Sequence, residues 1–271
     1  MGADLAPPAV VSVVKRELMG TISFENVSKT FSGQTEVRAL EGASLSVGEG
    51  EFVALLGPSG CGKSTLLNLL AGFEKATEGT LLFDGKTVTR PGPDRGVVFQ
   101  EAALFPWLNV WQNVVFGPQV QGVARSEYES RARKLLKLVG LEAFAEALPV
   151  QLSGGMRQRV GIARVLAMSP RALLMDEPFG ALDAQTRLSM QQLLLDVWQS
   201  LGTTVLFVTH DIDEAILLSD RICVMSARPG RIIRTIPIAL ARPRSIASLV
   251  SPEFIAYKAR IMSDIKVETV S

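Results

Sequence analysis

The sequence predicts an α/β protein with a mostly parallel sheet, and two observations carry this prediction. Short apolar runs of strand length alternate along the chain with longer segments of helical spacing, which is the order typical of a parallel sheet with helices on its faces. In addition, "EFVALLG" (residues 51–57) is a continuous apolar run that ends in glycine. Such a run indicates a strand that is buried on both faces.

The individual elements follow in order along the chain. "TISFENVSKTF" (21–31) and "ALEGASLSV" (39–47) read as strands, and "KSTLLNLLAGF" (63–73) has helical spacing. Further strands are expected at about residues 79–83, 96–99, 172–175 and 203–209. Between the last two, apolar residues at helical spacing mark one face of a helix: Met190, Leu194, Val197, Trp198 and Leu201.

Residues 100–167 are mostly helical in pattern, with the amphipathic segment "SRARKLLKLVGL" at their centre. Because predicted strands enclose this block, we expect an inserted helical subdomain at about residues 101–167 within a main domain of residues 21–236. Residues 1–20, with two adjacent prolines, are expected to form a flexible tail. Residues 237–271 are expected to form a C-terminal extension with the helix "PEFIAYKARIMSDI", and the tail from Arg228 also predicts a hairpin.

Composition bounds the classes of function. The chain has 271 residues and a formal net charge of +1, so the charge as a whole gives no argument for nucleic acid as a partner. Its two cysteines, Cys61 and Cys223, are too few for a disulfide framework, which fits a reducing cytoplasm. No apolar run approaches the ~20 residues that span a bilayer, and the N-terminus lacks the pattern of a secretory signal.

"GPSGCGKST" (57–65) lies between a predicted strand and a predicted helix and matches the pattern of a phosphate-binding loop. Its glycines allow main-chain N–H groups to turn toward phosphate oxygens, Lys63 can reach the β- and γ-phosphates, and the Ser64 hydroxyl can bind magnesium. The alternative is a glycine-rich turn that only caps a helix, but the strand–helix context favours nucleotide binding. The residues predicted to bind phosphate are Gly57, Pro58, Ser59, Gly60, Cys61, Gly62, Lys63, Ser64 and Thr65.

Three more predicted strands end in polar residues, at Gln100, at Asp176 followed by Glu177, and at His210. Ligands of open α/β sheets bind beyond the carboxyl ends of the strands, so these side chains are expected to meet Lys63 around one phosphate. Asp176 would hold magnesium through water, Glu177 would polarise the attacking water, and Gln100 could contact both. A lone histidine is more often structural, but the position of His210 after a buried strand favours a catalytic role.

A second anion-binding segment is "LSGGMRQRV" (152–160), in which Ser153, Gly154 and Gly155 open a basic helix. The first turn of a helix has free N–H donors and binds anions. Taken alone, this segment is more simply a helix cap with flexible glycines. It nevertheless raises the question why one chain should carry two phosphate-binding loops.

From about residue 21 onward, the chain resembles the ATP-binding subunits of ABC transporters. The resemblance rests on six motifs in the order of that family: "GPSGCGKST", "VVFQEAALFPW", "LSGGMRQRVGIARVL", "LLMDEP", "GALD" and "VTHD". It implies a P-loop NTPase core with an antiparallel β subdomain and an inserted α-helical subdomain, an ATPase activity, and ATP and Mg²⁺ as bound groups. It also implies a head-to-tail homodimer in which the "LSGG" of one subunit closes over the ATP held by the other.

The same resemblance assigns further residues. Asp183 of "GALD" would lie at the subunit boundary, and Phe31 would stack on adenine with Val37 beside it, although a core or turn position is the alternative for Phe31. One departure is Met156, where the commonest pattern of the family has Gln. A polar contact of this side chain to the opposite nucleotide is therefore in doubt.

The family resemblance implies a peripheral protein at the cytoplasmic face of the inner membrane, with permease subunits as direct partners and an extracytoplasmic solute-binding protein as an indirect one. The permease contact would lie between Gln100 and Trp111, a segment rich in apolar anchors, about half of which are expected in the core of the helical subdomain: Leu104, Phe105, Pro106, Trp107 and Trp111. "DEPFGALDA" and "PGRIIRTIPIALARPR" most resemble importers of nitrate, sulfonates and taurine. The expected cargo is thus a small anion.

Two alternatives remain at this point. An exporter subunit would use the same ATP chemistry. A soluble, non-transport ABC ATPase acting on nucleic acid would predict two nucleotide-binding units, a coiled-coil insertion or a basic stripe, none of which is visible in the sequence. The arginine-rich tail could face anionic lipid, but solvated charges on a hairpin are the favoured interpretation: Arg228, Arg231, Arg234, Arg242 and Arg244.

Overall fold

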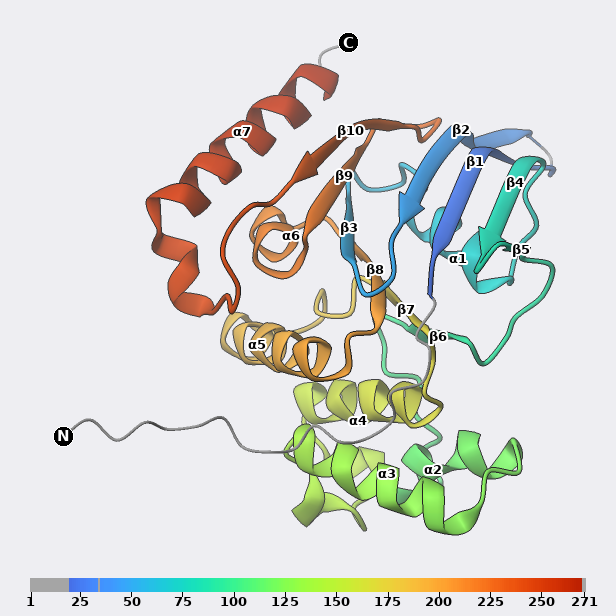
Figure 1. Cartoon of the computed structure of the whole chain (residues 1–271), viewed down its shortest axis with the longest axis vertical. Coiled ribbons are helices and arrows are strands. Elements are labelled where there is room, and N and C mark those ends of the chain that lie inside the picture. The colour runs from blue at the N-terminus through green and yellow to red at the C-terminus, as the bar shows by residue number, and fades with distance from the viewer. Residues whose placement is uncertain (1–19, 34, 270–271) are drawn as a thin grey trace.

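The computed structural model describes residues 20–33 and 35–269, so the predicted N-terminal tail lies almost wholly outside the described residues. The fold is built on two sheets (Figure 1). The larger one has the strand order β10–β9–β3–β8–β7–β6. Its strands are β3 (Phe52–Leu56), β6 (Arg95–Val98), β7 (Ala172–Asp176), β8 (Thr204–Thr209), β9 (Arg221–Met225) and β10 (Ile232–Pro237). All neighbours are parallel except β9 and β10, which confirms the predicted α/β class.

The smaller sheet is antiparallel and has the order β2–β1–β4–β5. Its strands are β1 (Ile22–Phe31), β2 (Val37–Val47), β4 (Glu78–Phe83) and β5 (Lys86–Thr87). Helix α1 (Lys63–Ala71) contacts strands of both sheets. It buries Leu66, Leu67 and Leu70 in a core shared with Val53 and Leu55 of β3. One face of β3 therefore packs into this core.

The opposite face of β3, with Phe52 and Leu56, belongs to a second core that includes the remaining helices. Those helices are α2 (Val110–Val120), α3 (Arg125–Leu138), α4 (Gly154–Ala167), α5 (Ala184–Leu201), α6 (Ile212–Leu218) and α7 (Pro252–Thr269), with the short 3-10 helices η1 (Glu142–Phe144), η2 (Pro149–Gln151) and η3 (Ile246–Val250). Because side chains alternate across a strand, β3 packs into both cores, as its unbroken apolar run predicted. All five of its residues are buried.

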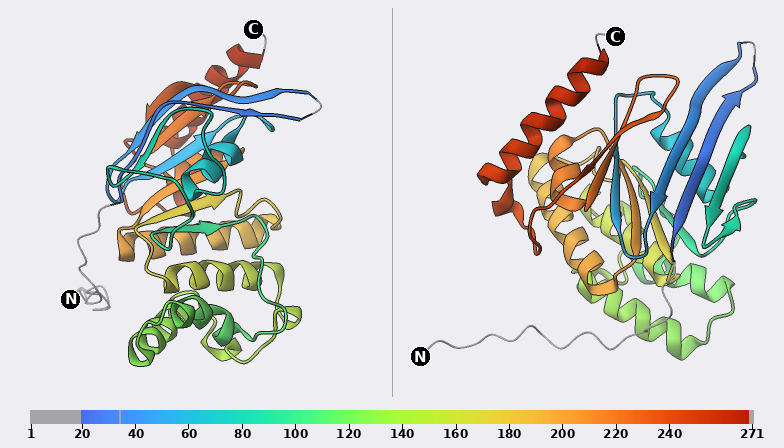
Figure 2. Two further views of the ribbon diagram at one scale, coloured as in Figure 1. Left: turned by 90° about the vertical axis from the view of Figure 1, so that its right-hand side faces the viewer. Right: turned by 45° about the horizontal axis from the view of Figure 1, so that its top comes forward.

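Helices α2, α3 and α4 pack on one another and lie together below the sheets (Figures 1 and 2). They lie between β6 and β7 in the chain, where the sequence predicted a helical block. Helix α7 lies at the opposite side of the parallel sheet from the antiparallel strands (Figure 1). Within the described ranges, none of the helices combines the length and apolar character needed to cross a bilayer.

The interpretation of the arginine-rich tail as solvated hairpin charges was wrong for two of its members. Arg244 is 2% exposed, and Arg242 bonds Asp220 at 2.7 Å while its guanidinium lies 4.1 Å from the centre of the Trp198 ring. The hairpin itself forms, but its first strand is β9, which precedes Arg228 and was not predicted. The reason is that this part of the chain folds back over α6, where the guanidinium groups of Arg242 and Arg244 donate to main-chain carbonyl oxygens.

Candidate nucleotide site

The turn between β3 and α1 is shaped by glycine. Gly60 and Gly62 have φ angles of 74° and 103°, in the left-handed region that favours glycine. A Cβ on Gly62 would also lie 2.8 Å from the carbonyl oxygen of Ala39. Glycine is therefore needed where the turn passes close to Ala39. The first turn of α1 has main-chain N–H groups without helical partners, and the helix dipole there favours an anion.

Lys63 is the first residue of α1 and is 5% exposed. Its ammonium group donates to the carbonyl oxygens of Gly57 and Pro58, at 2.8 and 3.0 Å. The side chain therefore curls over the loop, and its positive charge lies at the carbonyl oxygens of the turn. Outside this turn, Arg228 donates from Nε to the Gly60 carbonyl at 3.1 Å.

Ser64 and Asp176 come together from α1 and the end of β7. The Ser64 hydroxyl donates to Asp176 Oδ1 at 3.0 Å. Burial raises the pKa of Asp176 and outweighs the hydrogen bond from Ser64, and the neighbouring Glu177 raises it further. A hydroxyl and a carboxylate are the hard oxygen ligands that Mg²⁺ prefers, so the donor set fits this ion.

Glu177 and His210 come from the adjacent strands β7 and β8. Glu177 Oε2 lies 3.0 Å from His210 Nδ1. The main chain of Glu177 has a φ of 44°, and its N–H donates to the Val208 carbonyl at 3.0 Å. A positive φ is uncommon for residues other than glycine, and here it directs the side chain toward the end of β8. The carboxylate is thus oriented by the histidine.

Gln100 follows β6 and is exposed. A Cβ placed on Gly180 would lie 3.0 Å from Gln100 Nε2, so the side chain lies against the loop that follows Glu177. The preceding residue is tied to α4, since the buried Gln158 donates to the Phe99 carbonyl at 3.1 Å. The ends of β3, β6, β7 and β8 therefore bring together the four predicted catalytic residues, Lys63, Gln100, Glu177 and His210.

The second loop lies elsewhere in the chain's own fold. Ser153 caps α4 by accepting from Met156 N–H at 3.2 Å. A Cβ on Gly155 would lie 2.5 Å from Thr186 Cγ2. Asp183 caps α5 by accepting from Thr186 N–H at 3.0 Å, and hydrogen bonds from Thr186 hold the pKa of Asp183 below its usual range. Gly155 of the second loop therefore packs on the start of α5.

Phe31 and Val37 are directly paired across β1 and β2. The ring of Phe31 is 38% exposed, and the Lys29 ammonium lies 4.7 Å from its centre. An exposed ring next to an aliphatic side chain offers a flat apolar face, as a stacked base requires.

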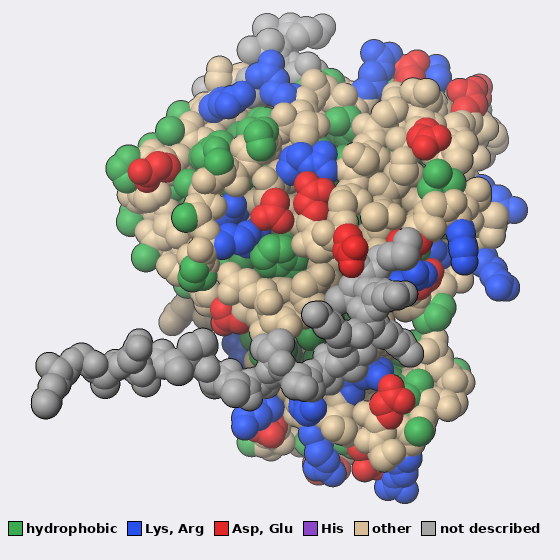
Figure 3. Space-filling view, in the orientation of Figure 1, with side chains coloured by type: hydrophobic (Ala, Val, Ile, Leu, Met, Phe, Trp, Pro, Cys, Tyr) green, Lys and Arg blue, Asp and Glu red, His purple; other side chains and the backbone are tan. Residues whose placement is uncertain are grey.

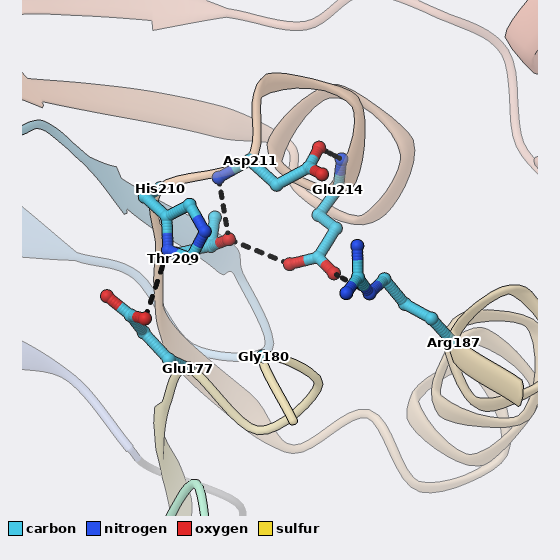
Figure 4. A pocket seen from close by; sticks show the side chains of 7 residues that line it. All are labelled: Glu177, Gly180, Arg187, Thr209, His210, Asp211 and Glu214. Carbon is cyan, nitrogen blue, oxygen red and sulfur yellow. Dashed lines mark hydrogen bonds and ion pairs between the residues drawn. The ribbon is translucent and has the colours of Figure 1, made fainter. Parts of the chain in front are cut away.

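Sequence reasoning missed a buried cluster behind His210 (Figure 4). Thr209 donates to Glu214 at 2.7 Å, and Gln191 donates to the other oxygen of Glu214 at 3.1 Å. Burial raises the pKa of Glu214. The available signal was Gln191, a polar residue beside the apolar face of the predicted helix that contains Met190 and Leu194. Helix α6, which carries Glu214, was not predicted.

A phosphate-binding turn, a hydroxyl–carboxylate pair and a carboxylate–histidine pair at adjacent strand ends define a nucleotide-hydrolysing P-loop protein. Residues 40–180 match the family model described as ABC transporter. The chain is 50% identical over 260 residues to an uncharacterised ABC transporter ATP-binding protein of Methanocaldococcus jannaschii, covering 95% of this chain and 96% of that protein. It therefore belongs to the ABC transporter family, as the six motifs predicted.

Relatives with a stated transport role are also similar. The taurine import ATP-binding proteins TauB of Pseudomonas aeruginosa and Burkholderia pseudomallei are 49% and 52% identical over 225 residues, which are 83% of this chain and 86% of each relative. Among solved structures, the ATP-binding cassette MJ0796, in a dimeric post-hydrolysis state bound to ADP and Pi, has a TM-score of 0.70 at 36% identity and covers 81% of this chain and 100% of that one. The chain is an ATPase of this family, and its hydrolysis of ATP is coupled to transport.

Proposed function

We propose that the protein is the ATP-hydrolysing subunit of an importer for a small anion, with taurine or a related alkanesulfonate as the first candidate. The observation that carries the catalytic part is the contact of Glu177 with His210, 3.0 Å long, beside the pair of Ser64 and Asp176. Glu177 polarises the attacking water, and His210 orients that carboxylate. Lys63 neutralises phosphate charge.

Magnesium would be held by Ser64 and Asp176, the latter through water, with Gln100 reaching it from the neighbouring strand end. The ion would supply charge stabilisation to the transferring phosphoryl group. Phe31 and Val37 would hold the base. All of these residues stand on rigid strand ends or on the first turn of α1, which keeps them in place for chemistry that depends on positioning.

A head-to-tail homodimer answers the question of the two loops. Within one chain, Gly155 of "LSGG" packs on α5, while the phosphate-binding turn lies between β3 and α1. The N-terminus of α4 then supplies its donors to the γ-phosphate held by a second copy, and Asp183 lies between the two sites. The dimeric state of MJ0796 supports this arrangement by similarity.

Permease subunits would dock on the segment from Gln100 to Trp111. Leu104 and Trp111 pack against the core of the helical region, whereas Trp107 is 71% exposed. Phe105 is held in place by two neighbours, since the centre of its ring lies 4.7 Å from that of Phe116 and 5.5 Å from the Arg164 guanidinium. Trp107 is thus an apolar anchor on a rigid support, as a helix of a partner requires.

Such docking would hold the subunit at the cytoplasmic face of the inner membrane, with an extracytoplasmic solute-binding protein delivering the cargo to the permease. On the face shown in Figure 3, basic and acidic side chains are interspersed. This pattern suits a protein partner better than the uniform negative charge of a nucleic acid. The direction of transport and the anion are supported by the similarity to TauB.

The first test is the solution mass of purified Glu177→Gln with and without ATP and Mg²⁺. The amide cannot polarise water, so ATP stays bound and a shift from monomer to dimer is expected. Ser153→Arg in the same background is the control, because it blocks the second loop and leaves the phosphate-binding turn intact. A dimer that forms equally in this control would contradict the shared site. For the cargo, normal growth of a deletion strain on taurine as sole sulfur source would refute the taurine assignment.

A further inference from the structure

A small pocket lies directly behind the pair of Glu177 and His210 (Figure 4). Its far wall is formed by Glu214 of α6 and Arg187 of α5, and Thr209 lies between the two walls. Glu214 and Thr209 are 5% and 2% exposed. The proposed catalytic mechanism uses neither of them, and a buried carboxyl group is costly unless it is well bonded.

The hydroxyl of Thr209 fixes the main chain on both sides of His210. It accepts from Asp211 N–H at 3.0 Å and donates to Glu214 Oε2 at 2.7 Å. Asp211 in turn accepts from the N–H groups of Asp213 and Glu214, at 2.8 and 3.0 Å. The residue before the histidine and the residue after it are therefore both tied, directly or through one bond, to Glu214.

The second oxygen of Glu214 faces α5. Oε1 accepts from Gln191 Nε2 at 3.1 Å, and Arg187 Nε lies 3.9 Å away. Arg187 Nε is buried and has no hydrogen-bond partner among the described residues, so Glu214 is the charge it faces. Both oxygens of one carboxyl group are thus held, one by the segment of His210 and the other by α5.

Helix α5 begins next to the second phosphate loop. Asp183 caps its first turn, and Thr186, the residue before Arg187, is the one that Gly155 approaches. A helix is rigid over a few turns, so a displacement at Thr186 moves Arg187 and Gln191 with it. The path from Gly155 to Glu214 consists of packed or bonded groups at every step.

We infer that Glu214 is a positioning residue that sets the orientation of His210 toward Glu177 according to the position of α5. This inference rests on the proposed function, because it connects the "LSGG" loop, which closes on a second copy, to the histidine of the chain's own site. Glu214 acts through Thr209 and does not touch the nucleotide. Closure of a dimer on the second loop would in this way be sensed at the catalytic pair.

The test uses Glu214→Gln and the exchange Glu214→Gln with Gln191→Glu. In the single variant, the one amide oxygen of residue 214 replaces two carboxylate oxygens that accept from Thr209 and Gln191. In the exchange, that oxygen can accept from Thr209 while the amide nitrogen donates to the new carboxylate on α5, so both bonds are restored. Gln199→Glu is the control, since it makes the same change as Gln191→Glu at an exposed position of α5. His210 is the only histidine of the chain, so protein made without a histidine tag gives a single set of imidazole NMR signals.

We expect Glu214→Gln to shift and broaden the His210 signals and to lower kcat about tenfold, with KM for ATP unchanged within about twofold. The exchange should restore the His210 signals to their positions in the unmodified protein and recover most of kcat. Gln191→Met, which removes only the donor from α5, should shift the signals in the same direction, and it keeps the test available if Glu214→Gln does not fold.

The positioning role is overturned if the His210 signals of Glu214→Gln match those of Gln199→Glu, or if the exchange does not restore them. The NMR signals are recorded on the free subunit without nucleotide, so they report on the contact even if the proposed function fails. Absence of ATP hydrolysis by the unmodified protein would instead count against the proposed function alone.

Discussion

Replacing Gly155 with alanine tests the contact between α4 and α5. A Cβ at this position would lie 2.5 Å from Thr186 Cγ2, while a Cβ on the neighbouring Gly154 has its closest contacts at 3.9 Å. Both glycines belong to the first turn of α4. Gly154→Ala and Gly155→Ala are therefore a matched pair that differ mainly in the space available to the added methyl group.

The two changes should differ in the free energy of unfolding. Alanine is favoured over glycine in a helix by up to about 1 kcal/mol, so Gly154→Ala should be neutral or slightly stabilising. Overpacking costs about 1–3 kcal/mol, and Thr186 cannot turn away cheaply because a β-branched side chain is stiff at χ1. We expect Gly155→Ala to be less stable than Gly154→Ala by about 2 kcal/mol.

Urea unfolding of the free subunit measures this difference. Thr186→Ser removes Cγ2 and keeps the hydroxyl, so the double variant Gly155→Ala with Thr186→Ser should unfold within about 0.5 kcal/mol of Thr186→Ser alone. Equal stability of the two alanine variants, or no recovery in the double variant, would refute the packing of the second loop on α5.

Three further predictions concern other parts of the chain. Arg244 donates to the carbonyl oxygens of Ile216, Ser219 and Ile238, and burial lowers its pKa to about 10; Arg244→Ala should lower the free energy of unfolding by about 3 kcal/mol, and a loss under 1 kcal/mol would contradict this. Trp107→Ala should leave stability within about 0.5 kcal/mol but abolish copurification with the permease; retained copurification would remove Trp107 as the anchor. Because burial raises the pKa of Glu214, its carboxyl group supports folding below the unfolded pKa and loses this contribution as pH rises through the folded pKa. The stability advantage of the unmodified protein over Glu214→Gln should therefore fall as the pH rises above 4.5, the ordinary pKa of a glutamate. An advantage that grows with pH would contradict a raised pKa of Glu214.

The strand prediction succeeded where the residues repeat a simple pattern. The unbroken apolar run of β3 and the apolar runs of β7 and β8 were placed within two residues of their observed bounds, because a strand buried on both faces leaves a continuous signal. The strand β9 was missed although all its residues except Arg221 are buried. Its short run follows α6 after only two residues, so it could not be distinguished from the end of a helix.

The sequence by itself determined which side chains meet at the nucleotide site. Parallel strands end at one edge of a sheet, so residues placed after β3, β6, β7 and β8 had to converge once the strands were recognised. The convergence follows from the order of the elements and from the residues that come after each strand, and both can be read directly from the chain.

Only the tertiary structure decided what supports those side chains. Arg244 lies buried among carbonyl oxygens, Gly155 lies against Thr186, and Glu214 joins Thr209 to Gln191. The contacts of Arg244 with Ile216, of Gly155 with Thr186 and of Glu214 with Gln191 each join different elements of the fold, and the sequence pattern does not identify which partner each residue has. Their geometry follows from how helices pack on the sheet, a property of many residues at once, and so a charged or small residue in the sequence does not disclose which partner it will meet.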